Sequence, residues 1–169
     1  VSLNFFRDHD ALAKDKISNC ILSNPYIKFK VETPVSVDLL MSKWSSLFGK
    51  IRLPIHLNGF NVTSDIEEAE NYNCDPLINK FITLSLFREI QKTSKEVRKL
   101  SYYLEHNCLF LLGGRDPFSS AEKTKLFIKG MPKNKGEFLF YENMGHDLFN
   151  EIGRDRMFND IYNWVNKEF

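Results

Sequence analysis

The fold is decided by one stretch of sequence, Cys-Leu-Phe-Leu-Leu-Gly-Gly-Arg-Asp-Pro at residues 108–117. Its first five residues are apolar and end at a glycine pair, which is typical of a strand buried on both faces of a sheet. A second strand is predicted at residues 137–141, and helices are predicted over 119–130 and 157–165. The order strand, helix, strand, helix over residues 107–169 predicts an α/β domain with a parallel sheet.

Each of these strands is followed by a loop that carries a residue suited to catalysis. Asp116 lies in the loop after the first strand, and His146 lies in the loop 143–147 after the second. Neighbouring parallel strands bring such loops to the edge where ligands bind in open α/β sheets, so we expect Asp116 beside His146. A carboxylate fixes the tautomer of a neighbouring imidazole and stabilises the imidazolium, which lets the histidine act as general base and acid. The sequence therefore predicts a catalytic pair.

A structural role is the alternative for either residue taken alone. An aspartate after a glycine pair is often a turn former or a helix cap, and a single histidine near a glycine is often a surface residue. The position of both residues at the ends of consecutive strands favours the catalytic interpretation. His9, His56 and His106 have no comparable setting, and we interpret them as structural.

The start of the chain predicts one helix and one strand. Residues 1–9 are interpreted as a helix, and residues 17–23 as a buried strand that ends at the Asn-Pro turn of residues 24–25. Two capping boxes, in which a serine precedes a glutamate by three positions, predict further helix starts at residues 64–67 and 119–122.

The sequence pattern over residues 25–105 predicts helices with no strand between them. An apolar stripe at helical spacing runs over residues 37–48, and a second long helix is predicted over residues 78–100. The apolar stripe suits either packing in the core or contact with lipid. Four basic residues form an edge on the second helix, which suits either solvent or anionic lipid headgroups. They are Lys92, Lys95, Arg98 and Lys99.

The composition is that of a folded globular chain. Of the 169 residues, 43% are hydrophobic and 27% are charged, which is unlike a disordered sequence. The 23 basic and 22 acidic residues leave a formal net charge of +1. A chain this close to neutral has no broad basic surface, so we expect no nucleic-acid partner.

The cysteines favour neither a metal site nor a disulfide framework. Cys20, Cys74 and Cys108 are odd in number and widely spaced, and they form no CxxC or Cys/His cluster. We therefore expect reduced cysteines in a cytoplasmic protein, with no metal and no cofactor. No apolar run approaches the roughly 18 residues that a membrane-spanning helix needs.

Five segments carry a resemblance to a known family. Residues 108–117 resemble the acid-bearing loop of the monoglyceride lipases and the related serine-aminopeptidase-like hydrolases. Residues 141–151, Tyr-Glu-Asn-Met-Gly-His-Asp-Leu-Phe-Asn-Glu, resemble the histidine loop of these enzymes, and residues 72–77 are similar to an element of their cap. Residues 1–9 and 17–25 are similar to the helix and strand that follow the nucleophile in that family.

This resemblance implies the C-terminal part of an α/β-hydrolase fold, a mostly parallel sheet flanked by helices with a helical cap insertion. Residues 1–24 would belong to the hydrolase core, residues 25–105 to the cap or lid, and residues 106–169 to the core again. Asp116 would be the acid of the catalytic triad, and His146 would be its base.

The resemblance also implies that the nucleophile lies outside this chain. The expected serine occupies a strained turn of the form G-x-S-x-G. No serine or cysteine in the chain has glycine both two positions before and two positions after it. Ser2 falls on the helix that should follow that turn. We therefore expect the serine and the oxyanion hole upstream of Val1, and we expect the 169 residues alone to be inactive.

The implied activity is that of a serine hydrolase that cleaves carboxylic esters, with monoacylglycerol as the leading substrate. One alternative is a general carboxylesterase, a lysophospholipase or an aminopeptidase-like hydrolase. Another is a hydrolase-fold module that binds lipid or a partner without turnover. The expected partners are a lipid or other acyl ester and the N-terminal half of the same fold. Peripheral contact of the cap with membranes or lipid droplets stays open.

Overall fold

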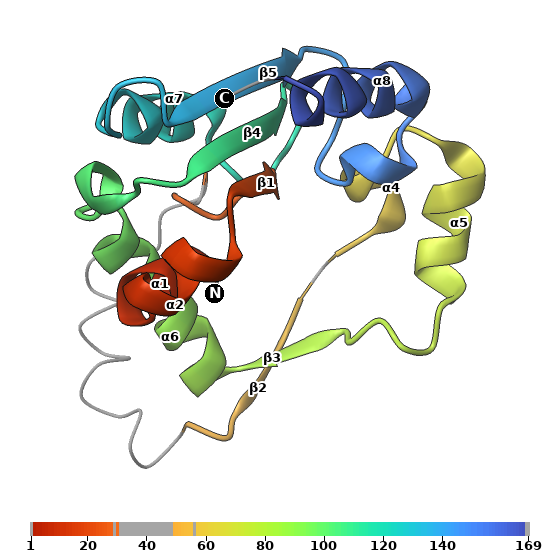
Figure 1. The fold of residues 1–169 in the computed structure, drawn as a ribbon. Coiled ribbons are helices and arrows are strands. Elements are labelled where there is room, and N and C mark those ends of the chain that lie inside the picture. Colours follow the sequence, from red (N-terminus) through yellow and green to blue (C-terminus); the bar gives the residue numbers. More distant parts are fainter. Residues whose placement is uncertain (1, 29, 31–48, 56, 168–169) are drawn as a thin grey trace.

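Residues 2–28, 30, 49–55 and 57–167 are described by a computed structural model of the chain (Figure 1). The elements are α1 (Ser2–Asp8), α2 (Asp10–Lys16), β1 (Asn19–Ser23), β2 (Arg52–Pro54), α4 (Gly59–Val62), α5 (Ile66–Cys74), β3 (Phe81–Thr83), α6 (Leu84–Val97), η1 (Ser101–Tyr103), β4 (Asn107–Gly113), α7 (Ala121–Lys129), β5 (Gly136–Tyr141), η2 (Leu148–Asn150) and α8 (Arg154–Val165).

A three-stranded parallel sheet lies at the centre of the fold. Its strand order is β1-β4-β5, with Ile21 opposite Leu109 and Leu111 opposite Leu139. The middle strand β4 is buried from Cys108 to its end, which confirms the prediction of a strand covered on both faces. The strand, helix, strand, helix order predicted for the last third of the chain is also confirmed.

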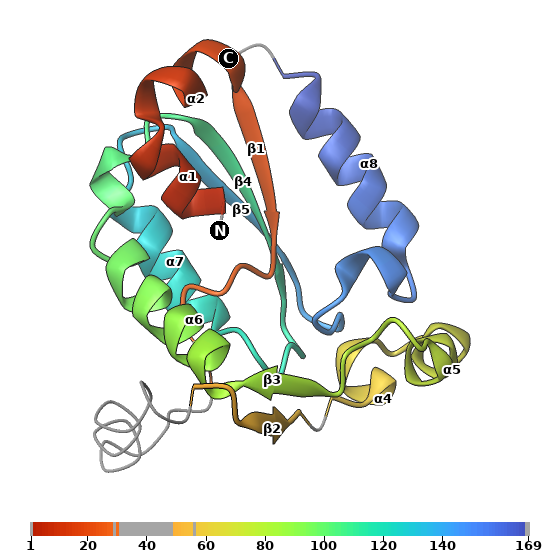
Figure 2. The same cartoon turned by 90° about the horizontal axis from the view of Figure 1, so that it is seen from below.

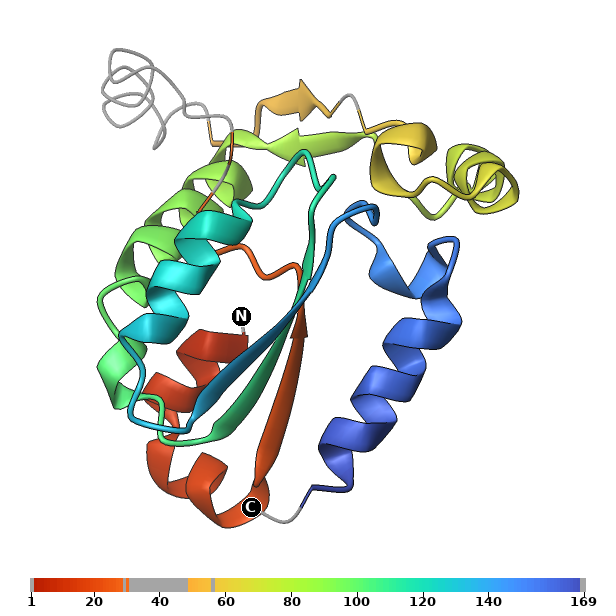
Figure 3. The ribbon, with the colours of Figure 1, turned by 90° about the horizontal axis from the view of Figure 1, so that it is seen from above.

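The two faces of the sheet are covered by different helices. Figures 2 and 3 show α1, α2, α6 and α7 on one side of the sheet and α8 on the other. On the first side Phe110 belongs to a core cluster with Phe6 and Phe127, and on the second side Leu111 belongs to another with Met157 and Trp164. This alternation along β4 follows from the period of two in a strand, which sends successive side chains to opposite faces.

The prediction that residues 25–105 hold no strand is wrong. β2 and β3 pair in antiparallel fashion, with Leu53 opposite Ile82. Together with α4 and α5 they lie beyond the carboxyl ends of the central strands (Figure 2). The helix predicted over 78–100 is correspondingly shorter, because α6 begins at Leu84. The side chain of Thr83 accepts a hydrogen bond from the Leu86 amide and so caps the N-terminus of α6.

The helix starts predicted from capping boxes exist, but in each case the capping residue is the one after the predicted serine. Asp65 accepts hydrogen bonds from the amides of Glu67 and Glu68 and caps α5. Ser120 accepts a hydrogen bond from the Lys123 amide and caps α7. The preceding residues are free for other contacts, and Ser119 donates to the backbone carbonyl of Asn24.

The N-terminal elements differ from the prediction in two respects. The helix of residues 1–9 ends at Asp8, and a second helix, α2, follows it directly. The strand of residues 17–23 begins at Asn19 and is only half-buried, because β1 is an edge strand of the described sheet. Ile21 of β1 is 36% exposed. It lies opposite Leu109, whose side of the sheet is the one that α8 covers.

The apolar stripe of residues 37–48 and His56 lie outside the described residues. The division into residues 1–24, 25–105 and 106–169 stays a prediction. None of the helices in the described part of the chain is long and apolar enough to cross a membrane.

Candidate active site

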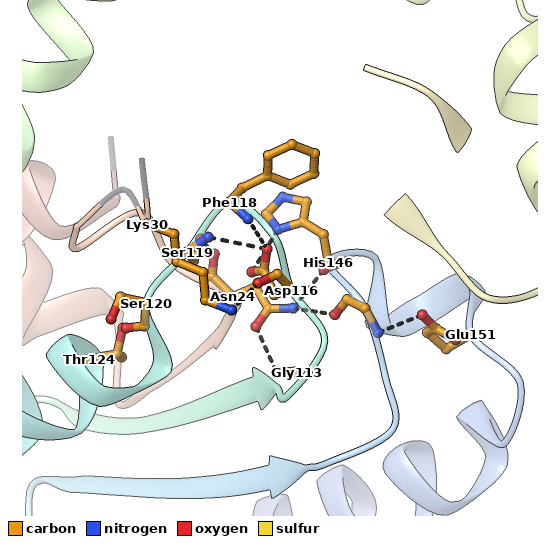
Figure 4. Close-up of polar contacts among 11 residues, drawn as sticks. Asn24, Lys30, Gly113, Asp116, Phe118, Ser119, Ser120, Thr124, His146 and Glu151 are labelled. Atoms are coloured by element: carbon orange, nitrogen blue, oxygen red, sulfur yellow. Dashed lines mark hydrogen bonds and ion pairs between the residues drawn. The ribbon is translucent and has the colours of Figure 1, made fainter. Parts of the chain in front are cut away.

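Asp116 and His146 are in direct contact at the carboxyl edge of the sheet (Figure 4). Oδ2 of Asp116 lies 2.9 Å from Nδ1 of His146. The two residues come from the loops after β4 and β5, which are neighbouring parallel strands. The Asp116 side chain is 1% exposed and that of His146 is 30% exposed. The expectation that these side chains lie together is therefore confirmed, while their catalytic role stays a prediction.

The carboxylate of Asp116 is held in place by its own loop. Its Oδ1 atom accepts hydrogen bonds from the amides of Phe118 (2.7 Å) and Ser119 (3.1 Å), which leaves Oδ2 for His146. Burial by itself raises the pKa of Asp116, but the hydrogen bonds from His146 and the two amides outweigh it and leave the pKa below its ordinary value. Asp116 is therefore a buried carboxylate that stays ionised at neutral pH.

This contact sets the orientation of the His146 ring. An ionised carboxylate can only accept a hydrogen bond, so Nδ1 carries the proton and Nε2 is left as the acceptor. The Phe118 ring lies against the imidazole in a T-shaped arrangement, with ring centroids 5.1 Å apart. His146 thus presents a basic nitrogen away from Asp116, and one wall beside the ring is apolar. Such an imidazole can take a proton from a hydroxyl nucleophile and return it to a leaving group.

A glycine at the end of β4 allows the two loops to approach each other. A Cβ atom on Gly113 would collide with the backbone carbonyl oxygens of Gly145 and Met144. Gly113 is therefore required by the close passage of the His146 loop over the strand end. The glycine pair that marks the strand end in the sequence thus serves the contact between the loops.

The remaining histidines of the described chain lie elsewhere. His9 is exposed at the start of α2. His106 is buried at the amino end of β4, where its Nδ1 atom lies 3.1 Å from the carbonyl oxygen of Ile17. Across the described residues, no group of three or more His, Cys, Asp or Glu side chains is arranged to hold a metal ion.

Three residues at this site were missed by the sequence reasoning. Asn24, Val62 and Glu151 all hydrogen-bond to the backbone of the loop that carries His146. Asn24 had been interpreted only as a turn former, and Glu151 only as part of the family resemblance. Val62 contributes its backbone carbonyl, a group that every residue possesses, so no sequence signal identifies it.

A parallel sheet, helices on both faces and an acid–histidine pair at the carboxyl edge define an α/β-hydrolase fold. Within that class, the chain belongs to the serine aminopeptidase, S33, family, whose model matches residues 2–153.

Solved structures agree with this fold. The monoacylglycerol lipase of Paleococcus ferrophilus aligns with a TM-score of 0.82 and 17% identity, over 96% of this chain and 63% of that one. A soluble variant of monoglyceride lipase from Saccharomyces cerevisiae, in complex with a substrate analog, aligns with a TM-score of 0.80 and 19% identity, over 97% of this chain and 60% of that one. At these identities the likeness shows the fold.

One curated relative is similar to almost the whole chain. The uncharacterized protein YnbC of Escherichia coli (strain K12) is 21% identical over 151 residues, which are 89% of this chain and 26% of that protein. The chain thus spans about a quarter of the length of this curated relative and less than two thirds of the two lipase structures.

Proposed function

We propose that this chain supplies the base and the orienting acid of a serine ester hydrolase whose substrate is monoacylglycerol. The observation that carries the proposal is the 2.9 Å contact between Nδ1 of His146 and Oδ2 of Asp116 at the carboxyl edge of the sheet. In this proposal the nucleophilic serine comes from a part of the full-length protein outside these 169 residues.

The two residues have distinct roles in the proposed reaction. Nε2 of His146 takes the proton of the serine hydroxyl as its oxygen attacks the ester carbonyl, and then protonates the departing glycerol oxygen. In the second half, Nε2 of His146 takes a proton from water as the water oxygen attacks the acyl-enzyme, and it then returns that proton to the serine oxygen as the fatty acid is released. Asp116 stays ionised throughout and stabilises the imidazolium that forms in each half.

Apolar groups beside the pair support an acyl ester as the substrate. Phe118 lies against the His146 ring. Segment 51–86, most of which lies beyond the strand ends, carries several exposed large apolar residues, and exposed apolar surface can mark a binding site. They are Ile51, Phe60, Ile66, Leu77, Phe81 and Leu86. The likeness of the fold to two monoacylglycerol lipases supports the same substrate.

Replacing His146 tests the proposal in the full-length protein. His146→Ala should lower kcat for monoacylglycerol by roughly 10⁴-fold or more, because the serine loses its general base. Labelling by a fluorophosphonate probe, which reports an activated serine without regard to substrate, should slow in parallel. His9→Ala is the matched control, since His9 is exposed outside the site. Undiminished turnover in His146→Ala would refute the proposal.

Probe labelling together with a panel of substrates separates the alternative functions. A general carboxylesterase or lysophospholipase would be labelled by the probe but would prefer short esters or lysophospholipids in a substrate panel. An aminopeptidase-like hydrolase would be labelled and would release amines from aminoacyl anilides. A non-catalytic binding module would show neither labelling nor turnover.

A further inference from the structure

The backbone of the loop that carries His146 is held by hydrogen bonds from two distant parts of the chain, Asn24 and Val62, and from the nearby Glu151. The amides of His146 and Asp147 both donate to the carbonyl oxygen of Val62, each at 2.9 Å. The neighbouring polar groups of Gly145 and His146 are bound by the side chains of Asn24 and Glu151 (Figure 4). Asn24 and Glu151 are both buried residues, with exposed fractions of 4% and 1%.

The side chain of Asn24 forms hydrogen bonds with the loop that carries His146 and with the start of the loop that carries Asp116. Its Nδ2 atom donates to the carbonyl oxygens of Gly145 (3.0 Å) and His146 (2.7 Å). Its Oδ1 atom accepts from the amide of Gly113 (2.8 Å), at the start of the loop that carries Asp116. The side-chain amide of Asn24 therefore joins the end of β4 to the His146 loop with all three of its hydrogen bonds.

The backbone of Asn24 extends this link to the acid. Its carbonyl oxygen accepts from the hydroxyl of Ser119, whose own amide donates to Oδ1 of Asp116. Asn24 has a φ of 39°, in the left-handed region that asparagine tolerates better than most residues. This conformation places Asn24, the first residue after β1, between the loop of Asp116 and the loop of His146.

Glu151 holds the opposite side of the same loop. Its Oε1 atom accepts from the amide of Gly145 at 2.6 Å and from the amide of Ser64 at 3.1 Å. Its Oε2 atom accepts from the Ser64 hydroxyl. The carboxylate thus joins the His146 loop to the segment between α4 and α5, two residues after Val62. A Cβ atom on Gly145 would collide with Oε1 of Glu151, so the fit is close.

We propose that Asn24 and Glu151 are positioning residues that set the placement of His146 against Asp116. The inference deepens the proposed function and rests on it for its catalytic consequence. The 2.9 Å contact joins two loops on different strands, so its length depends on how those loops are held relative to each other. Asn24 fixes that relative placement directly, and Glu151 fixes the His146 loop against the segment between α4 and α5. A displacement of about 1 Å in a catalytic group can lower the rate about 100-fold.

Substitution of Asn24 by glycine removes the side-chain contacts, and glycine adopts the left-handed backbone conformation without strain. In the full-length protein, Asn24→Gly should lower kcat for monoacylglycerol roughly 10- to 100-fold with KM little changed. The NMR resonance of the His146 Nδ1 proton, which reports the contact with Asp116, should move or broaden. Asn134→Gly is the matched control, since Asn134 is exposed, has a φ of 64° and lies before β5, away from the site.

A second Asn24 variant covers the case in which the glycine variant does not fold. Asn24→Asp keeps the size of the side chain and the acceptor for the Gly113 amide. It replaces the donor to the Gly145 and His146 carbonyls with an oxygen. We expect it to lose kcat and to shift the Nδ1 proton resonance as the glycine variant does, with a melting temperature that shows a folded protein.

Glu151 is tested by a pair of variants that differ in hydrogen bonding. Glu151→Ala leaves the Gly145 amide without its partner, so kcat should fall roughly 10-fold or more and the Nδ1 resonance should move. Glu151→Gln can accept from both amides through Oε1 and donate to the Ser64 hydroxyl, so it should stay within a few-fold of the wild type. Glu122→Ala, an exposed glutamate on α7, is the control.

The outcomes separate this inference from the proposed function. Wild-type kcat and an unmoved Nδ1 resonance in folded Asn24→Asp and Glu151→Ala would overturn the positioning role. A moved resonance in a full-length protein that cleaves no ester would support the positioning role and overturn the proposed function. A loss of kcat with an unmoved resonance would overturn positioning, because the variants would then act by another route.

Discussion

At the scale of single residues, the site depends on the negative charge of the buried Asp116 carboxylate, which would be unfavourable without its hydrogen-bond donors. A buried carboxylate loses its hydration, and the cost is several kcal/mol unless hydrogen bonds replace the lost water. Asp116 receives two amides and the His146 ring in exchange, and the net effect is a lowered pKa. The ionised form of Asp116 therefore stabilises the fold as well as the base.

This lowered pKa predicts a pH-dependent contribution to stability. Because the folded pKa of Asp116 lies below the unfolded value of about 3.9, its contribution is present above about pH 4 and is lost as the pH falls through the folded pKa. Asp116→Asn should lower the free energy of unfolding by about 2 kcal/mol at neutral pH, and by less at acid pH. Urea unfolding of both proteins across this range measures the difference. A difference that grows on acidification would contradict the assignment.

The residues that the sequence analysis identified are those whose chemistry shows in their type and position. Asp116 and His146 follow apolar strands, so the loops and their contact could be predicted. Asn24 and Val62 act on the His146 loop across more than 80 residues of sequence, and Glu151 joins Gly145, six residues before it, to Ser64, 87 residues away. Only the three-dimensional arrangement of the loops reveals such contacts, because nothing in the local pattern marks them.

At the scale of elements, the segments predicted correctly are those whose sequence pattern is compatible with only one kind of secondary structure. β4 is a short, wholly apolar run between a polar residue and a glycine pair, which fits a central strand. Residues 78–100 place apolar side chains four apart, which fits a helix over the whole range, yet Phe81–Thr83 forms β3. Pairing with β2 and the Thr83 cap decide where the helix begins, and both depend on the tertiary structure.

The cap of α7 gives a test at this scale. Ser120→Ala removes the acceptor for the Lys123 amide, so it should lower the free energy of unfolding by about 1 kcal/mol. Ser120→Asp should keep most of the stability, because aspartate is also a good capping residue and its charge suits a helix N-terminus. Thermal or urea unfolding checks both variants. Equal stability of the alanine variant and the wild type would show that another group caps this helix.

At the scale of the whole molecule, the described sheet ends in an open strand. β1 pairs with β4 on one side, and in the described part of the chain no strand pairs with its other side. Strands with an unpaired edge and apolar side chains favour association with other strands. The aligned lipase structures are longer than this chain, which covers 60–63% of them.

We therefore predict that residues 1–169, produced alone, associate or aggregate. Ile21 is 36% exposed on β1, and a charge at an edge position opposes strand pairing between molecules. Ile21→Lys should accordingly shift the population towards monomer, as measured by size-exclusion chromatography with light scattering. Leu12→Lys is the control, since Leu12 is exposed on α2 rather than on a strand. A monodisperse wild-type monomer that unfolds cooperatively would contradict the prediction.

The bonds around Val62 restrict how a substrate reaches the base. Val62 is bonded to the loop of His146, Thr63 and Ser64 are bonded to Asn150 and Glu151 just after it, and Glu68 of α5 pairs with Arg154 of α8 at 3.1 Å. An outward swing of α4 and α5 to admit an acyl chain would have to break these hydrogen bonds or pull the loop of His146 away from Asp116. An entry route that leaves α4 and α5 in place would keep these hydrogen bonds and the contact between His146 and Asp116. Slow amide exchange at His146 and Asp147 throughout turnover would be its signature.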